Sequence, residues 1–155
     1  MKTTLCAFSV LSLAFFFSCN EPQREQNVSS AETNEPHKHS EVLPNLRLNK
    51  GARWKVGDAT NKSIMQLQSI VELYEIEKNK TLAGYLEAGK KLEAGINVLI
   101  ENCKLSGAEH DALHEWLQPF MEDAEALSKV KNQEEGELYF EKVDAMLHKY
   151  YEYFE

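Results

Sequence analysis

The sequence predicts an all-α protein: an up-down-up-down four-helix bundle preceded by an extended arm and a disordered tether. Over residues 58–155, apolar residues recur at intervals of three and four, which is the spacing of one buried face of a helix. The loops between these periodic segments are short, so consecutive helices are expected to run antiparallel. Residues 20–45 hold almost no apolar side chains, and such a segment cannot bury enough surface to offset the entropy of ordering.

The first two helices are expected over residues 60–78 and 80–104. Their apolar stripes are Ile64, Leu67, Val71 and Tyr74 in the first, and Leu82, Tyr85, Leu92, Ile96, Leu99 and Cys103 in the second. The second helix also contains Gly84, Gly89 and Gly95, which lower its helix propensity. We expect these glycines to let a neighbouring helix approach closely.

The third helix is expected over residues 107–127. Ser106 and Glu109 form a capping-box pattern at its start, in which each side chain bonds the backbone at the other position. Pro119 is expected to bend this helix. Its expected inward stripe is His110, Leu113, His114, Leu117, Phe120 or Met121, Ala124 and Leu127. The fourth helix, over 133–154, is expected to turn inward Tyr139, Val143, Met146, Tyr150 and Phe154.

Residues 46–57 are expected to form an extended arm that packs on the bundle. Leu46 and Leu48 alternate with polar residues, and Trp54 and Val56 repeat this alternation. We expect Trp54, as a large aromatic residue, to be the anchor of the arm.

Residues 1–18 have the pattern of a secretory signal, with one lysine before an apolar run over 5–17. This run is shorter than the roughly 20 residues that a spanning helix needs, which disfavours a transmembrane anchor. Cys19 directly after the run makes the segment resemble the signal of a bacterial lipoprotein. The resemblance implies cleavage before Cys19 and attachment of lipid, such as palmitate, to it. Residues 19–45 would then be a lipidated flexible tether.

The cysteine count changes once this leader is removed. Cys6 is discarded with the leader and Cys19 carries the lipid, so Cys103 is the one thiol that we expect in the mature chain. We therefore expect no intramolecular disulfide, and stability must come from packing.

Cys103, His110 and His114 are the candidate metal ligands. The turn between the second and third helices is short, and two histidines four residues apart stack on one helix face. A thiolate and two imidazoles suit zinc or copper, and the soft sulfur favours Cu(I). The predicted function is metal buffering, delivery or sensing. The alternative is structural, with Cys103 as a small buried hydrophobic residue and the histidines hydrogen-bonded at a helix start.

No fourth ligand follows from this motif. Asp58, Met65, Met146 and His148 are expected at the same end of the bundle, with Met146 inward and His148 on the outer face. An open coordination position is the other alternative. The His-Lys-His segment at 37–39 could bind a metal weakly from the tether.

The sequence favours binding over catalysis, so no enzyme is expected. The segment HDALH differs from the zinc-protease motif HExxH at Asp111, which replaces the general base. Covalent haem is excluded because the sequence has no Cys-x-x-Cys-His motif. The formal net charge of −8 offers no basic face to nucleic acid. Membrane contact is expected through the N-terminal lipid. The alternative function is a lipid-anchored structural or interaction module that binds another envelope protein.

Two segments, LNKGARWKVG and NCKLSGAEHDALHEWLQPF, resemble a set of small, uncharacterised lipoproteins of Bacteroidota-type bacteria. The similarity spans roughly residues 46–120. It implies one recurring pattern of residues: Trp54, Cys103, His110, His114 and Pro119. Asn20 follows the lipid-bearing Cys19. Many lipoproteins that stay at the inner membrane have Asp at this position, and this chain does not resemble them there. By that difference the outer membrane is favoured.

Overall fold

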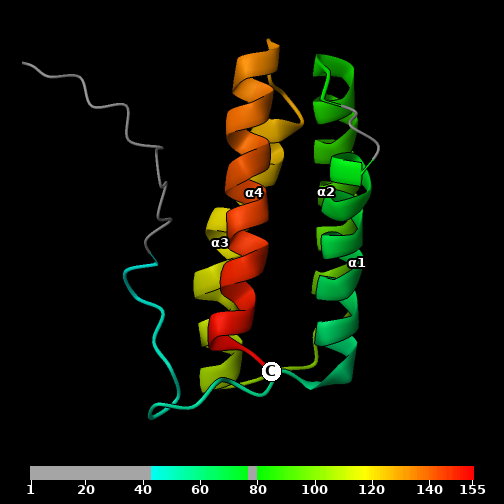
Figure 1. The fold of residues 1–155 in the computed structure, drawn as a ribbon. Helices are drawn as coiled ribbons and strands as arrows, with labels where there is room; N and C mark the ends of the chain where they lie inside the picture. The colour runs from blue at the N-terminus through cyan, green and yellow to red at the C-terminus, as the bar shows by residue number, and fades with distance from the viewer. Residues whose placement is uncertain (1–42, 77–79) are drawn as a thin grey trace, which may run out of the picture. The chain divides into compact units, whose positions relative to one another are not determined.

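The computed structural model describes residues 43–76 and 80–155, and within them it holds four helices and no strand longer than an isolated bridge. The predicted all-α, up-down-up-down bundle is confirmed, because each helix runs opposite to the one before it (Figure 1). The four helices are α1 (Gly57–Ile76), α2 (Leu82–Asn102), α3 (Ala108–Leu127) and α4 (Gln133–Tyr153).

The helices pack in ring order around one core. α1 packs on α2, α2 on α3, α3 on α4 and α4 on α1, and α2 also approaches α4 across the centre. The apolar stripe predicted for α1 is fully inside, and so are most stripe residues of the other helices. The predicted inward residues that are buried include Ile64, Leu67, Val71, Tyr85, Leu92, Ile96, Leu99, Leu113, Leu117, Ala124, Leu127, Val143, Met146, Tyr150 and Phe154.

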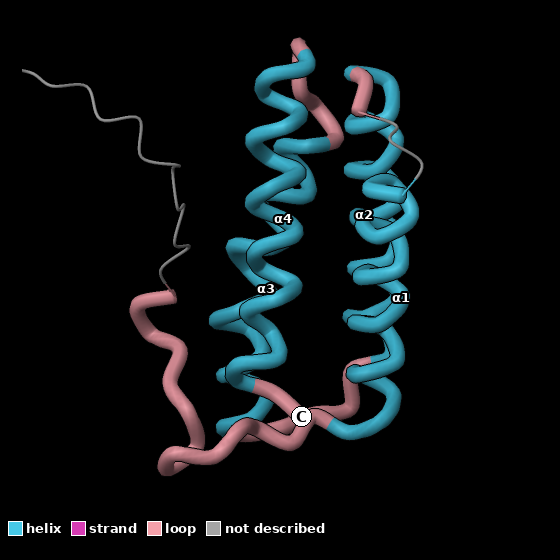
Figure 2. Tube along the Cα trace, viewed as in Figure 1, coloured by secondary structure: helices cyan, strands magenta, loops and turns pink. Residues whose placement is uncertain are grey.

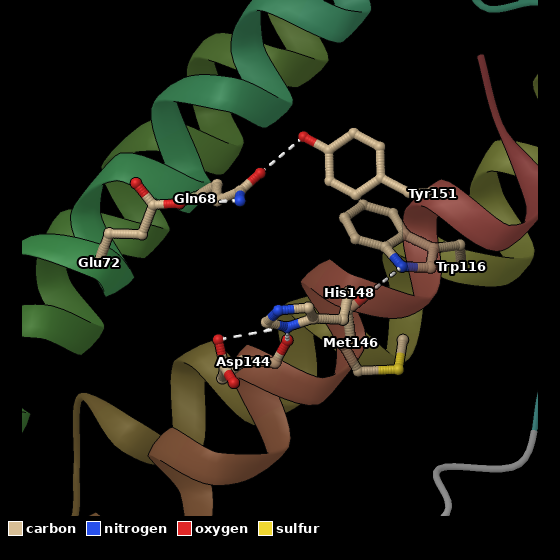
Figure 3. A network of polar contacts seen from close by, with 7 residues as sticks. All are labelled: Gln68, Glu72, Trp116, Asp144, Met146, His148 and Tyr151. Carbon is tan, nitrogen blue, oxygen red and sulfur yellow. Dashed lines mark hydrogen bonds and ion pairs between the residues drawn. The ribbon is translucent and has the colours of Figure 1, made fainter. Parts of the chain in front are cut away.

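Trp116 is the largest fully buried side chain, and the predicted stripe of α3 omitted it. Its ring stacks on Phe120 with centroids 4.9 Å apart and meets Tyr150 edge-on at 5.1 Å. Its Nε1–H donates to the Met146 carbonyl oxygen at 2.8 Å, as Figure 3 shows. Because this buried donor is satisfied, the indole joins α3 to α4 without a polar penalty.

The aromatic residues at the end of α4 continue this packing. Tyr150 stacks on Phe154 at 4.8 Å, and its hydroxyl donates to Asn61 Oδ1 of α1 at 2.8 Å. Burial raises the pKa of Tyr150 well above its usual value. The neighbouring Tyr151 stays at the surface and donates to Gln68 Oε1 at 2.7 Å (Figure 3). Two tyrosines thus join α4 to α1, one inside the core and one at its edge.

The helix starts differ from the predicted capping box. Gly107, with φ 68°, is the residue before α3, and no side chain caps that helix. The Ser106–Glu109 prediction is therefore wrong. Side-chain caps occur instead at Thr81, whose oxygen accepts from Gly84 N–H at 3.1 Å, and at Asn132, which caps α4. Short polar residues at these positions replace backbone partners that a helix start lacks.

Gly89 confirms the expectation that a glycine in α2 allows close approach. A Cβ placed there would lie 2.6 Å from Ser128 Cα and 2.8 Å from the Leu127 carbonyl carbon. α2 and the end of α3 are therefore in backbone contact at this point. At Gly95 the corresponding obstacle is only the side chain of Leu67. α3 itself continues through Pro119 as one helix.

The arm crosses the end of the bundle where α1 begins and α4 ends (Figure 2). Trp54 N–H donates to the Tyr153 carbonyl at 2.7 Å, and Glu155 N–H donates to the Trp54 carbonyl at 2.8 Å. Val56 N–H adds a third bond, to the Glu155 carbonyl at 3.1 Å. The arm is thus held by backbone pairing to the end of the chain.

The side chains that anchor the arm differ from those expected. Trp54 is only half-buried, and its Nε1–H donates to the Arg47 carbonyl at 2.7 Å. Leu46 and Val56 are buried, and so is Leu43, which the sequence analysis placed in the tether. The boundary at residue 45 is therefore corrected, since Leu43 already belongs to the core.

The expected signal at 1–18, Cys6, Cys19 and the tether up to residue 42 lie outside the described residues. Among the helices that the structure does describe, none is long and apolar enough to cross a membrane.

Replacing the buried indole should destabilise the bundle strongly. We expect Trp116→Ala to lower the free energy of unfolding by about 3–5 kcal/mol, because it opens a cavity at the α3–α4 contact. Met65→Ala, at an exposed position of α1, should change it by less than about 0.5 kcal/mol. Urea denaturation followed by circular dichroism measures both. Equal effects of the two substitutions would contradict the central position of Trp116.

The backbone contact at Gly89 should reverse the usual effect of a helical Gly→Ala change. In an exposed helix interior this change stabilises by about 1 kcal/mol. We expect Gly89→Ala instead to destabilise by about 1–3 kcal/mol, since the backbone of Ser128 must move. Gly95→Ala should cost less, because a leucine side chain can shift. The same denaturation experiment compares the two, and a stabilised Gly89→Ala protein would refute the contact.

Candidate functional site

The structure brings Cys103, His110 and His114 together at the α2–α3 connection. Cys103 follows the last residue of α2 and is half-buried against the core. His110 lies in the first turn of α3, and His114 lies one turn later on the same side. Convergence of these three residues follows from a short turn and a spacing of four, as the sequence predicts.

His110 contacts the other two residues through different ring nitrogens. Its Nδ1 lies 3.8 Å from Cys103 Sγ, and its Nε2 lies 3.0 Å from His114 Nε2. The two imidazoles meet edge to face, with centroids 4.5 Å apart. The ring–ring contact is a hydrogen bond whose direction depends on the tautomer. His110 is therefore the central member of this cluster, which we call the thiol–imidazole cluster.

Both distances are close to those between two ligands of one metal ion. With metal–nitrogen bonds of about 2.0–2.1 Å, two nitrogens lie about 2.9 Å apart at a right angle and about 3.3 Å apart at the tetrahedral angle. The observed 3.0 Å falls between these values. For a metal–sulfur bond of about 2.3 Å, the tetrahedral sulfur–nitrogen distance is about 3.6 Å. The observed 3.8 Å is slightly longer.

One ion cannot use both nitrogens of His110, because their lone pairs diverge across the ring. As placed, the residues offer two ligand pairs that share one imidazole. The pair of His110 and His114 has two nitrogen donors, which suit Zn²⁺ or Cu²⁺. The pair of Cys103 and His110 has one soft donor, which suits Cu(I). A three-ligand site needs a rotation of the His110 ring.

The exposure of the histidines differs from the expected inward stripe. His110 is half-buried and His114 is exposed. The buried face of α3 instead contains Trp116, next to Leu113, Leu117 and Phe120. The signal for Trp116 was present in the sequence, since it lies four residues before Phe120. Because the predicted stripe includes both histidines, the predicted buried face of α3 is rotated about the helix axis and leaves out Trp116.

The four candidates for a further ligand are not part of the cluster. Met146 is fully buried, and its carbonyl accepts from Trp116, whereas Met65 is exposed on α1. His148 bonds to the Asp144 carbonyl at 2.9 Å and lies 3.4 Å from its carboxylate (Figure 3). Asp58 lines a surface hollow together with Lys104 and Leu105 of the α2–α3 connection, and no cluster residue lines it. Over the described part of the chain, no three His, Cys, Asp or Glu side chains are arranged to hold one metal ion together.

The surroundings of the cluster hold more acidic than basic side chains, with Lys104 beside the cysteine as a basic one. Glu109 and Asp111 lie in the first turn of α3, and Glu115 follows His114 at the surface. Such a field raises the local concentration of cations. The arrangement can therefore attract a metal ion to an exposed imidazole, and it keeps coordination positions open to solvent.

Comparison of the chain with protein-family models, with curated proteins and with solved structures finds no match in any of the three.

Proposed function

We propose that this chain is a lipid-anchored protein of the cell envelope whose helical bundle binds a transition-metal ion, copper or zinc. The observation that carries the proposal is the double contact of His110, with one nitrogen 3.8 Å from a thiol and the other 3.0 Å from a second imidazole. Both distances suit metal ligands. The proposed role is binding, with no catalytic step.

The accessibility of the cluster supports exchange over permanent binding. Structural zinc sites have four protein ligands and are closed. Here His114 is exposed, and each ligand pair leaves positions for water or for a ligand from a partner. Buffering or delivery of metal in the envelope fits such a site better than a structural role. Removal of metal should then leave the bundle folded, because none of the three cluster side chains is among the buried core residues, although Cys103 packs against them.

Metal binding is tested on protein comprising residues 20–155, with His37 and His39 replaced by Asn to remove the tether histidines. Calorimetric titration should give one tight equivalent of Zn²⁺ or Cu²⁺, and competition titration under reducing conditions should give one of Cu(I). We expect His110→Ala to weaken all three by about tenfold or more, since both ligand pairs use this ring. His114→Ala should affect mainly Zn²⁺ and Cu²⁺, and Cys103→Ser mainly Cu(I).

Two controls accompany this titration. His148→Ala removes a surface histidine outside the cluster and should leave all affinities unchanged. Lowering the pH should weaken binding in the unaltered cluster, because the ligating forms are the neutral imidazole and the thiolate. Metal binding that survives replacement of Cys103, His110 and His114 together would refute the proposal. The interaction module without a metal site would then be the better description.

The lipid anchor is supported by the leader pattern and is tested separately. We expect the protein to incorporate labelled palmitate when expressed in a bacterium with a lipoprotein pathway. Cys19→Ser should abolish the label, whereas Cys6→Ser should retain it, because Cys6 lies within the expected leader. Fractionation of the labelled protein tests the favoured outer-membrane location. Label that persists in Cys19→Ser would contradict the anchor. Membership of a set of small envelope lipoproteins, which the sequence resembles, belongs to the same proposal.

A further inference from the structure

A second feature lies between α2 and α3, away from the thiol–imidazole cluster. It is a surface groove of about 390 Å³. Ile96 of α2 and Met121 of α3 provide its apolar part. Ile96 is 3% exposed and Met121 is 39% exposed, so Met121 is the more accessible of the two. The volume is at the lower end of the range for ligand pockets, about 300–1,000 Å³. A groove of this volume can hold one large side chain of a partner and the backbone next to it.

The rim of this groove is acidic. Glu93, Glu122 and Glu125 line it, together with the amides of Asn97 and Gln118. Lys129 pairs with Glu125, so it offsets part of this charge.

The other two carboxylates of the rim bond to neutral donors. Glu93 accepts from Ser128 Oγ at 2.8 Å, and Glu122 accepts from Gln118 Nε2 at 3.3 Å. These two contacts leave the negative charges in place, although Lys129 also interacts electrostatically with Glu93. With three carboxylates and one lysine, the rim stays net acidic and attracts positive side chains around an apolar centre.

We infer that the α2–α3 groove docks a cationic amphipathic segment of another protein, with an apolar side chain between Ile96 and Met121 and flanking Lys or Arg residues on the glutamates. Helix-in-groove recognition uses this combination of apolar anchors and charged edges. The inference does not depend on the proposed metal binding.

Charge disfavours two occupants, a second copy of the chain and the segment 20–42. A second copy would bring a net charge of −8 against an acidic rim. The segment 20–42 holds more acidic than basic residues and no large apolar side chain other than valine. A basic partner is the occupant with complementary charge, and charge complementarity mainly fixes which partner is chosen.

One end of the groove lies close to the α2–α3 connection, so a bound partner would lie near the thiol–imidazole cluster. Gln118 and Met121 line it, and His114 lies one turn before Gln118 on the same flank of α3. On α2, Ile100 lies one turn after Ile96 and is exposed. A helix in the groove would therefore extend along exposed apolar surface toward the α2–α3 connection.

The test uses residues 20–155 without added metal and a fluorescent synthetic helix as the probe. The probe carries one leucine face flanked by lysine and arginine, and a second peptide has glutamate at each basic position. We expect the basic peptide to bind and its affinity to fall as salt is raised, because the rim charges are exposed. Met121→Lys should weaken binding about tenfold, since it places a positive charge in the groove.

Met65→Lys is the matched control. It makes the same substitution, with the same change in net charge, at a methionine of α1 that is 62% exposed. We expect it to weaken binding less than twofold.

Equal effects of the two substitutions would show general attraction to an acidic protein and would overturn the docking site. Equal binding of the glutamate peptide, or no binding of the basic one, would do the same. Because the peptide test contains no metal, a negative result does not bear on the proposed metal site. A negative metal titration likewise does not bear on the docking site.

Discussion

Burial of Trp116 is the constraint on which the arrangement of the bundle depends. A fully buried indole that stacks on Phe120 and donates to the Met146 carbonyl fixes how α3 is rotated about its own axis. Turning α3 by one residue would expose a large apolar surface and leave a buried N–H without an acceptor. With that rotation fixed, His110 and His114 lie on the flank of α3 beside α2. The position of the thiol–imidazole cluster is thus a consequence of core packing.

Much of the fold is present in the periodicity of the sequence. The stripe of α1 predicts its buried face residue by residue, because its members recur at intervals of three and four: Ile64, Leu67, Val71 and Tyr74. Met65 and Leu73 are equally apolar but fall outside this spacing, and both are exposed. The buried face of α3 is harder to predict, because a histidine can lie on either face of a helix and two histidines lie at helical spacing. The capping box at Ser106 failed because Gly107 adopts a positive φ and begins the helix differently. Capping geometry depends on backbone angles that residue types permit but do not fix.

The candidate site could be predicted as a set of residues but not as a geometry. A short turn and an i, i+4 spacing suffice to bring Cys103, His110 and His114 close together. Which ring nitrogen contacts which partner depends on side-chain torsions, and residue spacing along a helix does not fix these torsions. The groove between α2 and α3 has no sequence signature either. It arises from residues far apart in the chain, such as Glu93 and Glu125, that become neighbours only through helix packing.

The backbone contact at Gly89 holds α2 against the end of α3. A Cβ at this position would lie 2.6 Å from Ser128 Cα, so a residue other than glycine fits only if the backbone moves. At the opposite end of the pair, the chain itself joins the two helices through the connection that holds Cys103 and His110. The two helices are therefore held together at both ends, once by packing and once by covalent connection. A substitution at Gly89 would release one of these two restraints and leave the other in place.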